Sequence, residues 1–562
     1  MPVKNSSNTK KTASKEKTKK EKPALKSAPV SVVLSFATPG MSALHRTGLG
    51  GLAAVLHCLD KIKEKIDEEE PEFPFDSPLW REDFAWKIDK NSVELNFGKP
   101  ENAALFLEWL FQFAFQIKDE MIFLPALYGV KNGKINVIPI EVRSRLQKGI
   151  TLTFLQHGQT RKLGSEQTKE YEVDGKKISY EHKDCLSYTH QTAWKEWVNN
   201  KGELVLKNYS VQGPIHPGAV VRHAAYTSSS LIAQPLELVL PLIFALVGTL
   251  SVPINNGVGV LIIPYIDDLV SFSQNWHRVC PKTVKTSMIA GLGDASIQFE
   301  LRRRGESLKN RVKIPGCEAV CFRPMPWATQ QKSRCDTLTL EHIDPDILDL
   351  YDRVLSYFPP RLIENKKNKK EGKGKNAVVT ETVEYFLADS VVRPFIADNL
   401  ARGNYWFKGF TKQMTAYDAV SKKPLREKIK FEKEGLNKMI NDEKLDWKLE
   451  GAQSVVLAVQ ESLKFLYGKK IAESKNLSQE GKNNRLEGEY EKWRIAFSGA
   501  KTQEQFRFAL SDMFSRAKGI PVLQNDWQSV MKIVVQDWQL ARDLALIGLA
   551  AYKGKNEGKK EE

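Results

Sequence analysis

Two adjacent aspartates, Asp267 and Asp268, are the residues of this 562-residue chain whose type and spacing most directly suggest chemistry. They lie in LIIPYIDDLVSF, residues 261–272, after a tyrosine and between two apolar segments. A Tyr-x-Asp-Asp pattern is typical of the hairpin of palm-type nucleic-acid polymerases, where the carboxylates hold the metal ions of phosphoryl transfer. The motif therefore raises one specific hypothesis, a metal-dependent polymerase.

A palm polymerase needs a third carboxylate on a neighbouring strand, and the upstream sequence offers poor candidates. Asp174 lies in YEVDGKKISYEH, which predicts the turn of a β-hairpin, and Asp184 is expected in a polar loop. A strand followed by a helix whose first turn contains Asp267 and Asp268 explains the motif more simply, because acidic side chains stabilise a helix N-terminus. We favour this interpretation and keep the polymerase as the alternative.

Other catalytic and metal motifs are missing from the sequence. It contains neither the G-x-x-x-x-G-K-[ST] phosphate loop nor the G-x-S-x-G nucleophile elbow. Cys317 and Cys321 are four positions apart in an expected strand, whereas zinc sites favour C-x-x-C pairs. We therefore expect unpaired, buried thiols, no metal, no cofactor and no enzymatic activity.

The net charge of +16 is concentrated in two short segments. Residues 1–27 hold nine lysines and two glutamates, and residues 366–375 hold six lysines and one glutamate. The rest of the chain is close to neutral, so a high pI alone does not indicate a nucleic-acid-binding surface. Such lysine runs are typical of solvated tails and linkers.

The most apolar segment, residues 231–254, is interrupted by Glu237 and three prolines. It therefore lacks an uninterrupted span of about 20 apolar residues, which a transmembrane helix needs. We expect a buried helix with its connections, no contact with a membrane, and a soluble, cytoplasmic protein.

Hydrophobic periodicity divides the chain into two parts of different character. A strand is expected from Ser31 and a helix from near Ser42 to Lys65, in which the glycines at 48, 50 and 51 indicate close approach of another backbone. Residues 380–552 have helical periodicity. The expected fold class is α+β, a mixed α/β N-terminal body followed by a C-terminal α-helical bundle.

Further strands are expected at 134–142, 149–156, 257–265, 295–303 and 318–324, with a second hairpin at 197–210. The expected domain limits are a lysine-rich tail (1–30), the body (31–364), a lysine-glycine linker (365–376), the bundle (377–552) and a second tail (553–562).

Three segments carry the side-chain chemistry of nucleic-acid contacts. RRRGESLKNRVK, residues 302–313, has six basic residues around an expected turn. WATQQKSR, residues 327–334, combines glutamines and basic side chains, which can contact base edges and phosphates. RGNYWFKGF, residues 402–410, interleaves basic and aromatic residues, as stacking surfaces do. A solvated basic turn, or a partly buried aromatic helix end, is the competing interpretation of each.

Four segments together resemble a known family. LSFATPGMSALHRTGLGGLAAVL, PWATQQKSR, IADNLARGNYWFKGF and DWQLARDLALIGLAAY resemble the large subunit of type I CRISPR effector complexes (Cascade). Within that group the resemblance is to the MYXAN lineage, grouped with types I-A and I-B. It spans roughly residues 30–552, and the lysine-rich N-terminal tail has no counterpart that we can name.

The resemblance implies a non-catalytic subunit of an RNA-guided ribonucleoprotein complex. Such a subunit sits at the 5′ end of the guide CRISPR RNA, recognises the protospacer-adjacent motif on double-stranded target DNA and stabilises the R-loop. Its implied partners are the backbone subunit, the 5′-end capping subunit and a small subunit. The complex would serve antiviral interference or CRISPR-guided transposition, in which case transposition proteins are partners too. A non-CRISPR nucleic-acid-binding scaffold remains a further alternative.

The implied correspondence also covers the C-terminal bundle, which would match a small subunit lying along the guide–target duplex. An internal start at Met414 or Met439 would yield that part as a separate chain. Side-chain chemistry then gives the expected contacts. Those near the adjacent motif are Gln330, Gln331, Lys332 and Arg334, with Asn255 and Asn256. Those to the nucleic-acid backbone are Arg302, Arg303, Arg304, Lys309, Arg311, Arg402 and Lys408.

Overall fold

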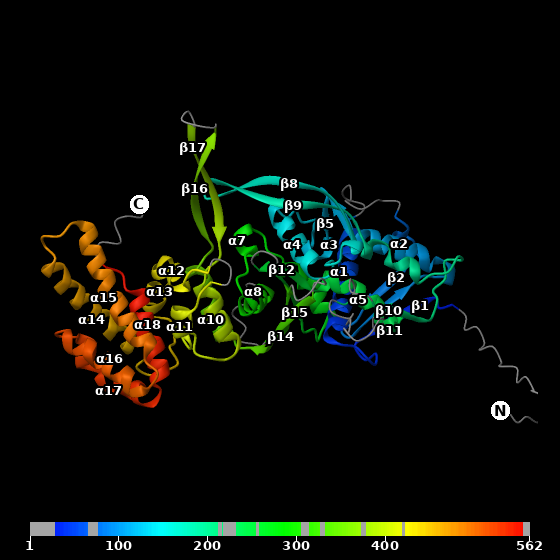
Figure 1. Ribbon diagram of the computed structural model, residues 1–562. Coiled ribbons are helices and arrows are strands. Elements are labelled where there is room, and N and C mark those ends of the chain that lie inside the picture. Colours follow the sequence, from blue (N-terminus) through cyan, green and yellow to red (C-terminus); the bar gives the residue numbers. More distant parts are fainter. Residues whose placement is uncertain are drawn as a thin grey trace, which may run out of the picture.

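The computed structural model describes residues 28–65, 77–211, 216, 232–254, 258–304, 314–325, 332–371, 378–418 and 422–554. Figure 1 shows an elongated molecule with a mixed α/β body at one end and a helical bundle at the other. Long β-hairpins project from the region between them (Figure 1). The expected fold class is confirmed, since helices α14 to α18 form an all-helical C-terminal region behind a body built on sheets.

Two tightly packed helices, α1 (Ala43–Lys63) and α5 (Leu236–Gly248), form the centre of the body. Ser42 caps α1, as expected, by accepting a hydrogen bond from the backbone N–H of His45. A Cβ atom on Gly48 would lie 1.9 Å from the carbonyl oxygen of Pro241. The helices can pack this closely only because glycine has no side chain, which confirms the expectation of close backbone approach.

A four-stranded antiparallel sheet in the order β12-β13-β14-β15 lies beside this helix pair. Its strands are β12 (Leu250–Ile254), β13 (Val258–Pro264), β14 (Ile314–Met325) and β15 (Lys332–Ile343). The expected strands at 257–265 and 318–324 are therefore confirmed. The buried segment that precedes them, α5 and β12, confirms the interpretation of residues 231–254.

The rest of the body consists of short strands and helices around these elements. The short strands are β1 (Ser31–Ser35), β2 (Ala85–Ile88), β3 (Ser92–Asn96), β4 (Gln116–Lys118), β5 (Met121–Phe123), β6 (Val130–Lys131), β7 (Lys134–Ile135), β10 (Asn208–Val211) and β11 (Ile232–Pro235). The helices are α2 (Ala103–Ala114), α3 (Pro125–Tyr128), α4 (Ile140–Leu152), α6 (Leu269–Asn275), α7 (Val284–Ser287), α8 (Leu292–Arg304) and α9 (Pro345–Tyr357), with a 3-10 helix at Thr189–Glu196.

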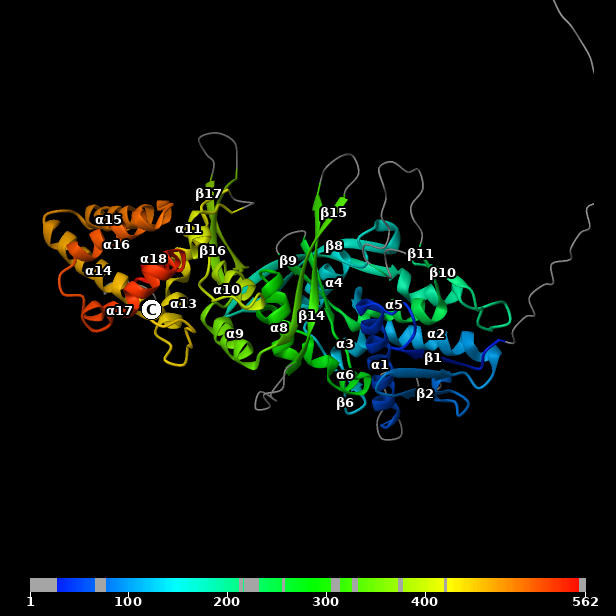
Figure 2. The same ribbon diagram turned by 90° about the horizontal axis from the view of Figure 1, so that it is seen from below.

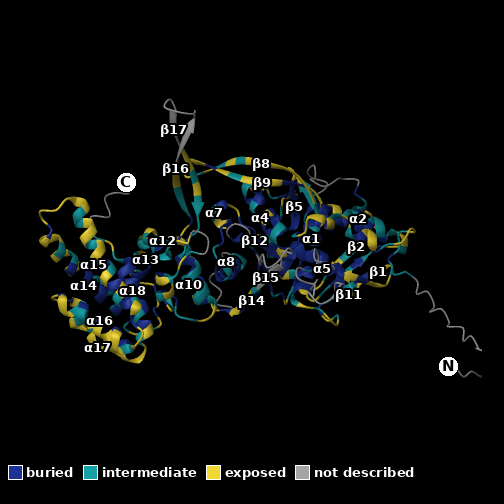
Figure 3. Cartoon of the chain, viewed as in Figure 1, coloured by how far each residue is buried: buried dark blue, intermediate teal, exposed yellow. Residues whose placement is uncertain are grey.

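Two long hairpins form a second four-stranded sheet in the order β16-β17-β9-β8. The first, β8 (Arg161–Val173) and β9 (Lys176–Tyr188), turns at Asp174, whose φ is 51°, as the sequence predicted. The second pairs β16 (Arg361–Glu371) with β17 (Val378–Ala388). Residues 365–371, expected within a linker, therefore belong to a paired strand. Figure 3 shows β8 largely exposed, whereas buried residues gather around α1 and α5 and inside the bundle.

The bundle surrounds the C-terminal helix α18 (Trp538–Ala551), in which eleven residues from Leu540 to Ala551 are buried. The other helices of this region are α10 (Val392–Ala401), α11 (Phe410–Thr415), α12 (Leu425–Ile429), α13 (Lys433–Ile440), α14 (Ala452–Glu473), α15 (Gln479–Gly499), α16 (Gln503–Arg516) and α17 (Pro521–Gln536). Within the described residues, no helix is both long and apolar enough to cross a membrane.

A buried ion pair joins the body to the start of the helical region. Arg393 of α10 donates to Asp294 of α8 from Nε (3.2 Å) and Nη2 (3.1 Å), and neither side chain is more than 1% exposed. Arg393 also donates to the carbonyl oxygens of Met288 and Phe358. The hydroxyl of Tyr351 on α9 donates to Asp294 as well. Helices α8, α9 and α10 are thus held by one polar cluster.

Several local predictions were wrong. Residues 295–303, expected as a strand, lie in α8, and residues 149–152 of the strand expected at 149–156 lie in α4. Residues 380–388, expected as helix, belong to β17. Asp184 lies in β9 rather than in a loop. In the expected second hairpin, only the bridge between Val198 and Leu204 forms, and β10 pairs with β11 instead.

Candidate nucleic-acid interface

The aspartate pair lies at the junction between a strand and a helix, as the favoured interpretation predicted. Asp268 is the N-cap of α6, and its Oδ1 accepts the backbone N–H of Ser271 at 3.0 Å. Asp267 is exposed just before the cap. In the described part of the chain, no three His, Cys, Asp or Glu side chains gather as a metal site would require. The capping bond gives Asp268 a structural role.

The five cysteines whose side chains the structure describes are buried, and no disulfide joins any two of them. Burial raises the pKa of Cys58 and of Cys280 to about 12, so these thiols stay protonated at neutral pH. Cys317 and Cys321 lie within β14, opposite residues of β13 and β15, and do not face each other across a loop. The expectation of buried thiols outside disulfides is confirmed for these residues.

The segment WATQQKSR contributes to the hairpin of β14 and β15, which Figure 2 shows rising from the body. Lys332 is the first residue of β15 and pairs with Met325, and Arg334 pairs with Arg323. Gln330 and Gln331 lie outside the described residues, as do Asn255, Asn256, Lys309 and Arg311. Lys332 and Arg334 thus stand next to the connection that carries the two glutamines.

The strand register places two of the expected motif-reading connections at the same end of one sheet. Ile254 pairs with Val258 where β12 turns into β13, and the neighbouring Gly259 pairs with Phe322 of β14. From Phe322, β14 continues only to Met325 before the chain leaves the sheet. The strands that flank residues 255–257 and residues 326–331 therefore end at the same end of the sheet, although the two segments are far apart in sequence.

The arginines at the end of α8 are occupied inside the body. Arg302 is half-buried and donates to the side-chain oxygen of Gln298 and the carbonyl oxygen of Thr286, and burial lowers its pKa to about 10. Arg304 is 8% exposed and donates to Asp349 at 3.2 Å. These contacts fix the end of α8, so we leave both residues out of the proposed DNA contacts. Arg303 is half-buried near Glu300, with 3.6 Å between Nη1 and Oε1.

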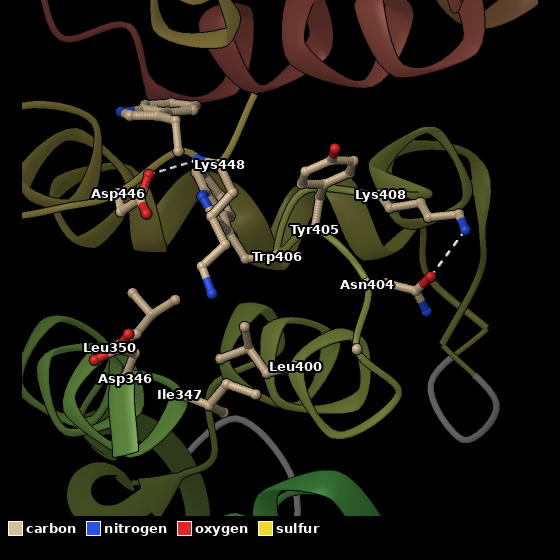
Figure 4. Close-up of a pocket in the computed structure, with 12 residues that line it drawn as sticks. Asp346, Ile347, Leu350, Leu400, Asn404, Tyr405, Trp406, Lys408, Asp446 and Lys448 are labelled. Carbon is tan, nitrogen blue, oxygen red and sulfur yellow. Dashed lines mark hydrogen bonds between the residues drawn. The ribbon is translucent and has the colours of Figure 1, made fainter. Parts of the chain in front are cut away.

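The third segment, RGNYWFKGF, lines a pocket of about 430 Å³ between the body and the bundle. Figure 4 shows Ile347, Leu350 and Leu400 on one side of this pocket, facing Tyr405 and Trp406 on the other. Trp406 packs against Trp447 with ring centroids 5.3 Å apart. We call this the aromatic pocket. Its lining residues are Asp346, Ile347, Leu350, Leu400, Gly403, Asn404, Tyr405, Trp406, Lys408, Asp446, Trp447 and Lys448.

Charged side chains surround the aromatic pocket. Lys408 is exposed and donates from Nζ to Asn404 Oδ1 at 2.8 Å (Figure 4). Asp446 accepts the backbone N–H of Lys448, also at 2.8 Å. Arg402, at the C-terminal end of α10, is exposed as well. Of the expected backbone contacts, Lys408 thus lines the pocket, and Arg402 directly precedes the lining residue Gly403 in the chain.

The loop that carries the pocket is held from two sides. The side-chain amide of Asn399 donates to the carbonyl oxygens of Trp406 and Lys408. Asp543 of α18, 4% exposed, accepts the backbone N–H groups of Gly409 (2.6 Å) and Thr411 (2.8 Å). Burial raises the pKa of the Asp543 carboxyl. Two of the segments that carried the family resemblance are therefore in direct contact.

Comparison with known proteins supports the assignment suggested by those segments. A family model described as the DevT N-terminal domain matches residues 33–243, and one described as the DevT C-terminal domain matches residues 443–562. A protein of Myxococcus xanthus (strain DK1622), named CRISPR-associated protein Cas8a1/Csx13, is 31% identical over 546 residues, which cover 95% of this chain and 90% of that relative. The resemblance found in the sequence is confirmed. The chain therefore belongs to the Cas8a1/Csx13 family of CRISPR-associated proteins, the large subunits of type I Cascade complexes.

Proposed function

We propose that this large subunit recognises the protospacer-adjacent motif on double-stranded DNA and stabilises the R-loop, without a catalytic step of its own. The observation that supports the proposal is that the strands flanking residues 255–257 and residues 326–331 end at the same end of the β12–β15 sheet. In RNA-guided recognition, base pairing reads the target sequence while protein reads only a short adjacent motif. Two connections anchored at one end of a sheet suit that task.

The residues at this sheet end have suitable chemistry. Glutamine and arginine can form two hydrogen bonds to one base edge in the major groove, and lysine neutralises phosphates. Gln330, Gln331, Lys332 and Arg334 are the proposed contacts to the motif, with Asn255 and Asn256 on the neighbouring connection. Arg303, near the end of α8, is proposed as a backbone contact, as are Lys309 and Arg311, which follow that helix in the sequence. Arg402 and Lys408 are proposed as further backbone contacts.

The proposed partners follow from the family. They are the guide CRISPR RNA, the target duplex, the backbone subunit, the 5′-end capping subunit and a small subunit, with transposition proteins added if the complex serves transposition. A separate product starting at Met414 or Met439 would lack Gly409 and Thr411, the hydrogen-bond donors to the buried Asp543. We therefore propose that the bundle acts as part of the full-length chain. Mass spectrometry of the purified complex that finds a shorter product would contradict this.

The proposal is tested with the assembled complex and a variant carrying Lys332→Ala and Arg334→Ala. Gel-shift titration at fixed salt should show that target-duplex binding is lost while assembly on the guide RNA is unchanged. A matched control, Lys99→Ala with Lys131→Ala, removes two charges from exposed positions elsewhere on the body and should bind normally. Unchanged duplex binding by the first variant would refute the assignment.

A further inference from the structure

The end of strand β12 has a neighbour on each of its two edges. Ile254, the last residue of β12, pairs with Val258 of β13 on one edge. On the other edge it forms an isolated parallel bridge with Ile289, which lies in the connection between α7 and α8. Ile254 and Ile289 are 6% and 2% exposed. The point at which the chain leaves the sheet toward residues 255–257 is therefore held from both sides.

The two peptide groups that flank Ile289 are bound by the buried ion pair between α8 and α10. Arg393 donates from Nη2 to the carbonyl oxygen of Met288 at 3.1 Å. The backbone N–H of Ala290 donates to Oδ2 of Asp294 at 2.7 Å. Arg393 and Asp294 are bonded to each other, and both are buried. One member of the pair thus holds the peptide group before Ile289, and the other holds the peptide group after it.

The contact between α8 and α10 is close on both sides of this pair. A Cβ atom on Gly291 would lie 3.0 Å from Cβ of Pro394 in α10. The backbone N–H of Gly293 donates to Oδ1 of Asp398 at 2.9 Å. Figure 1 shows α8 between α10 and the β12–β15 sheet. The end of β12 is therefore connected to α10, the first helix of the helical region, through Ile289 and the ion pair.

We propose that Arg393 and Asp294 are positioning residues for recognition of the adjacent motif. By holding Ile289 against Ile254, they fix the end of the strand from which residues 255–257 start. Groups that make selective contacts must be supported by neighbours that are themselves held in place. This inference rests on the proposed function, because residues 255–257 carry two of the proposed motif contacts. It links motif recognition to the attachment of the helical region to the body.

A purely structural role of the ion pair predicts a different result. In that case, loss of the pair lowers the stability of the chain and leaves the sequence preference of the bound duplex unchanged. A positioning role changes the preference itself, because one well-placed contact to a base edge supplies roughly tenfold discrimination or more against a wrong base. The preference for adjacent base pairs is therefore the quantity to measure.

The test uses the assembled complex and a pool of duplexes that share the guide-complementary sequence and differ in the base pairs beside it. Sequencing of the bound fraction gives the preference for these base pairs. Arg393→Lys keeps a charge near Asp294 but lacks the planar fork that donates to both Asp294 and the carbonyl oxygen of Met288. We expect it to lower the ratio of affinities for the best and worst adjacent sequences by about tenfold. Binding to a duplex already opened over the guide-complementary region should be unchanged.

Matched variants separate positioning from a general loss of stability. Arg494→Lys makes the same substitution at another buried arginine, which pairs with Glu491 inside α15, and should keep the normal preference. Gly291→Ala is a milder second variant that retains the ion pair and presses the segment before α8 against Pro394. It should weaken the preference in the same direction, whereas Gly488→Ala, with open space around it, should not. If Arg393→Lys does not fold, Gly291→Ala decides the question.

Hydrogen–deuterium exchange of the full-length chain tests the contact itself. Arg393→Lys should speed the exchange of backbone amides in residues 250–254, and Arg494→Lys should leave it unchanged. Unchanged exchange in these residues of Arg393→Lys would overturn the inference. So would a normal preference for adjacent base pairs in Arg393→Lys or, where that variant does not fold, in Gly291→Ala.

These outcomes are separable from those of the proposed function. If the unchanged complex has no preference for any adjacent sequence, the proposed function is refuted, and the positioning role with it. If the unchanged complex has a preference that depends on Lys332 and Arg334 but survives in Arg393→Lys, the positioning role alone is refuted.

Discussion

Arg393→Met tests whether the buried ion pair between α8 and α10 holds the body and the bundle together. The substitution removes two hydrogen bonds to Asp294 and those to the carbonyl oxygens of Met288 and Phe358, at positions no more than 1% exposed. Asp294 would keep only the backbone N–H of Ala290 and the hydroxyl of Tyr351. Leaving one charge of a buried pair without its partner costs about 3–5 kcal/mol.

Urea unfolding of the full-length chain, followed by tryptophan fluorescence, measures this cost. We expect Arg393→Met to lower the free energy of unfolding by about 3–5 kcal/mol. The double variant with Asp294→Asn removes both charges, so its loss should be clearly smaller than the sum of the two single losses. A loss below about 1 kcal/mol for Arg393→Met, or additive losses in the double variant, would refute this account of the polar cluster.

Three further predictions concern the cap of α6, the contact of Gly51 with α5, and the buried His190. Asp268→Ala should lower the free energy of unfolding by about 1 kcal/mol because α6 loses its cap, whereas Asp268→Asn should be nearly neutral; equal losses would contradict a capping role. Gly51→Ala should destabilise by about 1–3 kcal/mol in the same assay, since its Cβ would lie 2.3 Å from the carbonyl oxygen of Phe244, while Gly468→Ala, with open space around it, should be neutral or stabilising. Burial lowers the pKa of His190 to about 3, so the unfolded chain binds a proton that the folded chain does not; stability should fall between pH 6.5 and pH 3 by up to about 1.4 kcal/mol per pH unit, and His190→Phe should flatten that part of the profile.

The elements that could be predicted from the sequence are those with a local physical signature. Ser42 before an apolar run gave the start of α1, and the Asp-Gly turn at 174 gave the hairpin of β8 and β9. The glycines of α1 correctly indicated close packing, although nothing in their spacing identified α5 as the neighbour. The position of Asp268 at the start of a helix could be predicted from the sequence because helix capping depends on residues that are close together in the chain.

The errors arose where long-range contacts decide the structure. In α8, every residue from Gly293 to Glu300 is buried, so the helix has no polar face and its apolar residues imitate a strand. Residues 149–156 contain β-branched side chains that favour strands, yet the first four of them lie in α4, which packs against β12 with Gly149 against the carbonyl of Ser251. Strand β17 forms because it pairs with β16 and meets β9 at Tyr385, contacts that no local pattern reveals.

In the candidate sites, too, local residue types could be predicted to matter, whereas contacts between distant segments could not. Residue types identified the basic and aromatic segments, and the structure places Lys408, Tyr405 and Trp406 at one pocket. Sequence reasoning missed the contribution of Trp447 and of Asp346, because they come from a distant loop and from α9. The sequence also did not indicate that Arg302 and Arg304 form hydrogen bonds within the chain, to Gln298 and to Asp349.

Recognition of the adjacent motif by this subunit is tested most directly by comparing binding of the assembled complex to two targets, an intact duplex and a duplex already opened over the guide-complementary region. We expect Lys332→Ala with Arg334→Ala to abolish binding to the intact duplex but to leave most of the binding to the opened one, where base pairing with the guide supplies the affinity. Equal affinity of the variant and the unchanged complex for the intact duplex would contradict it.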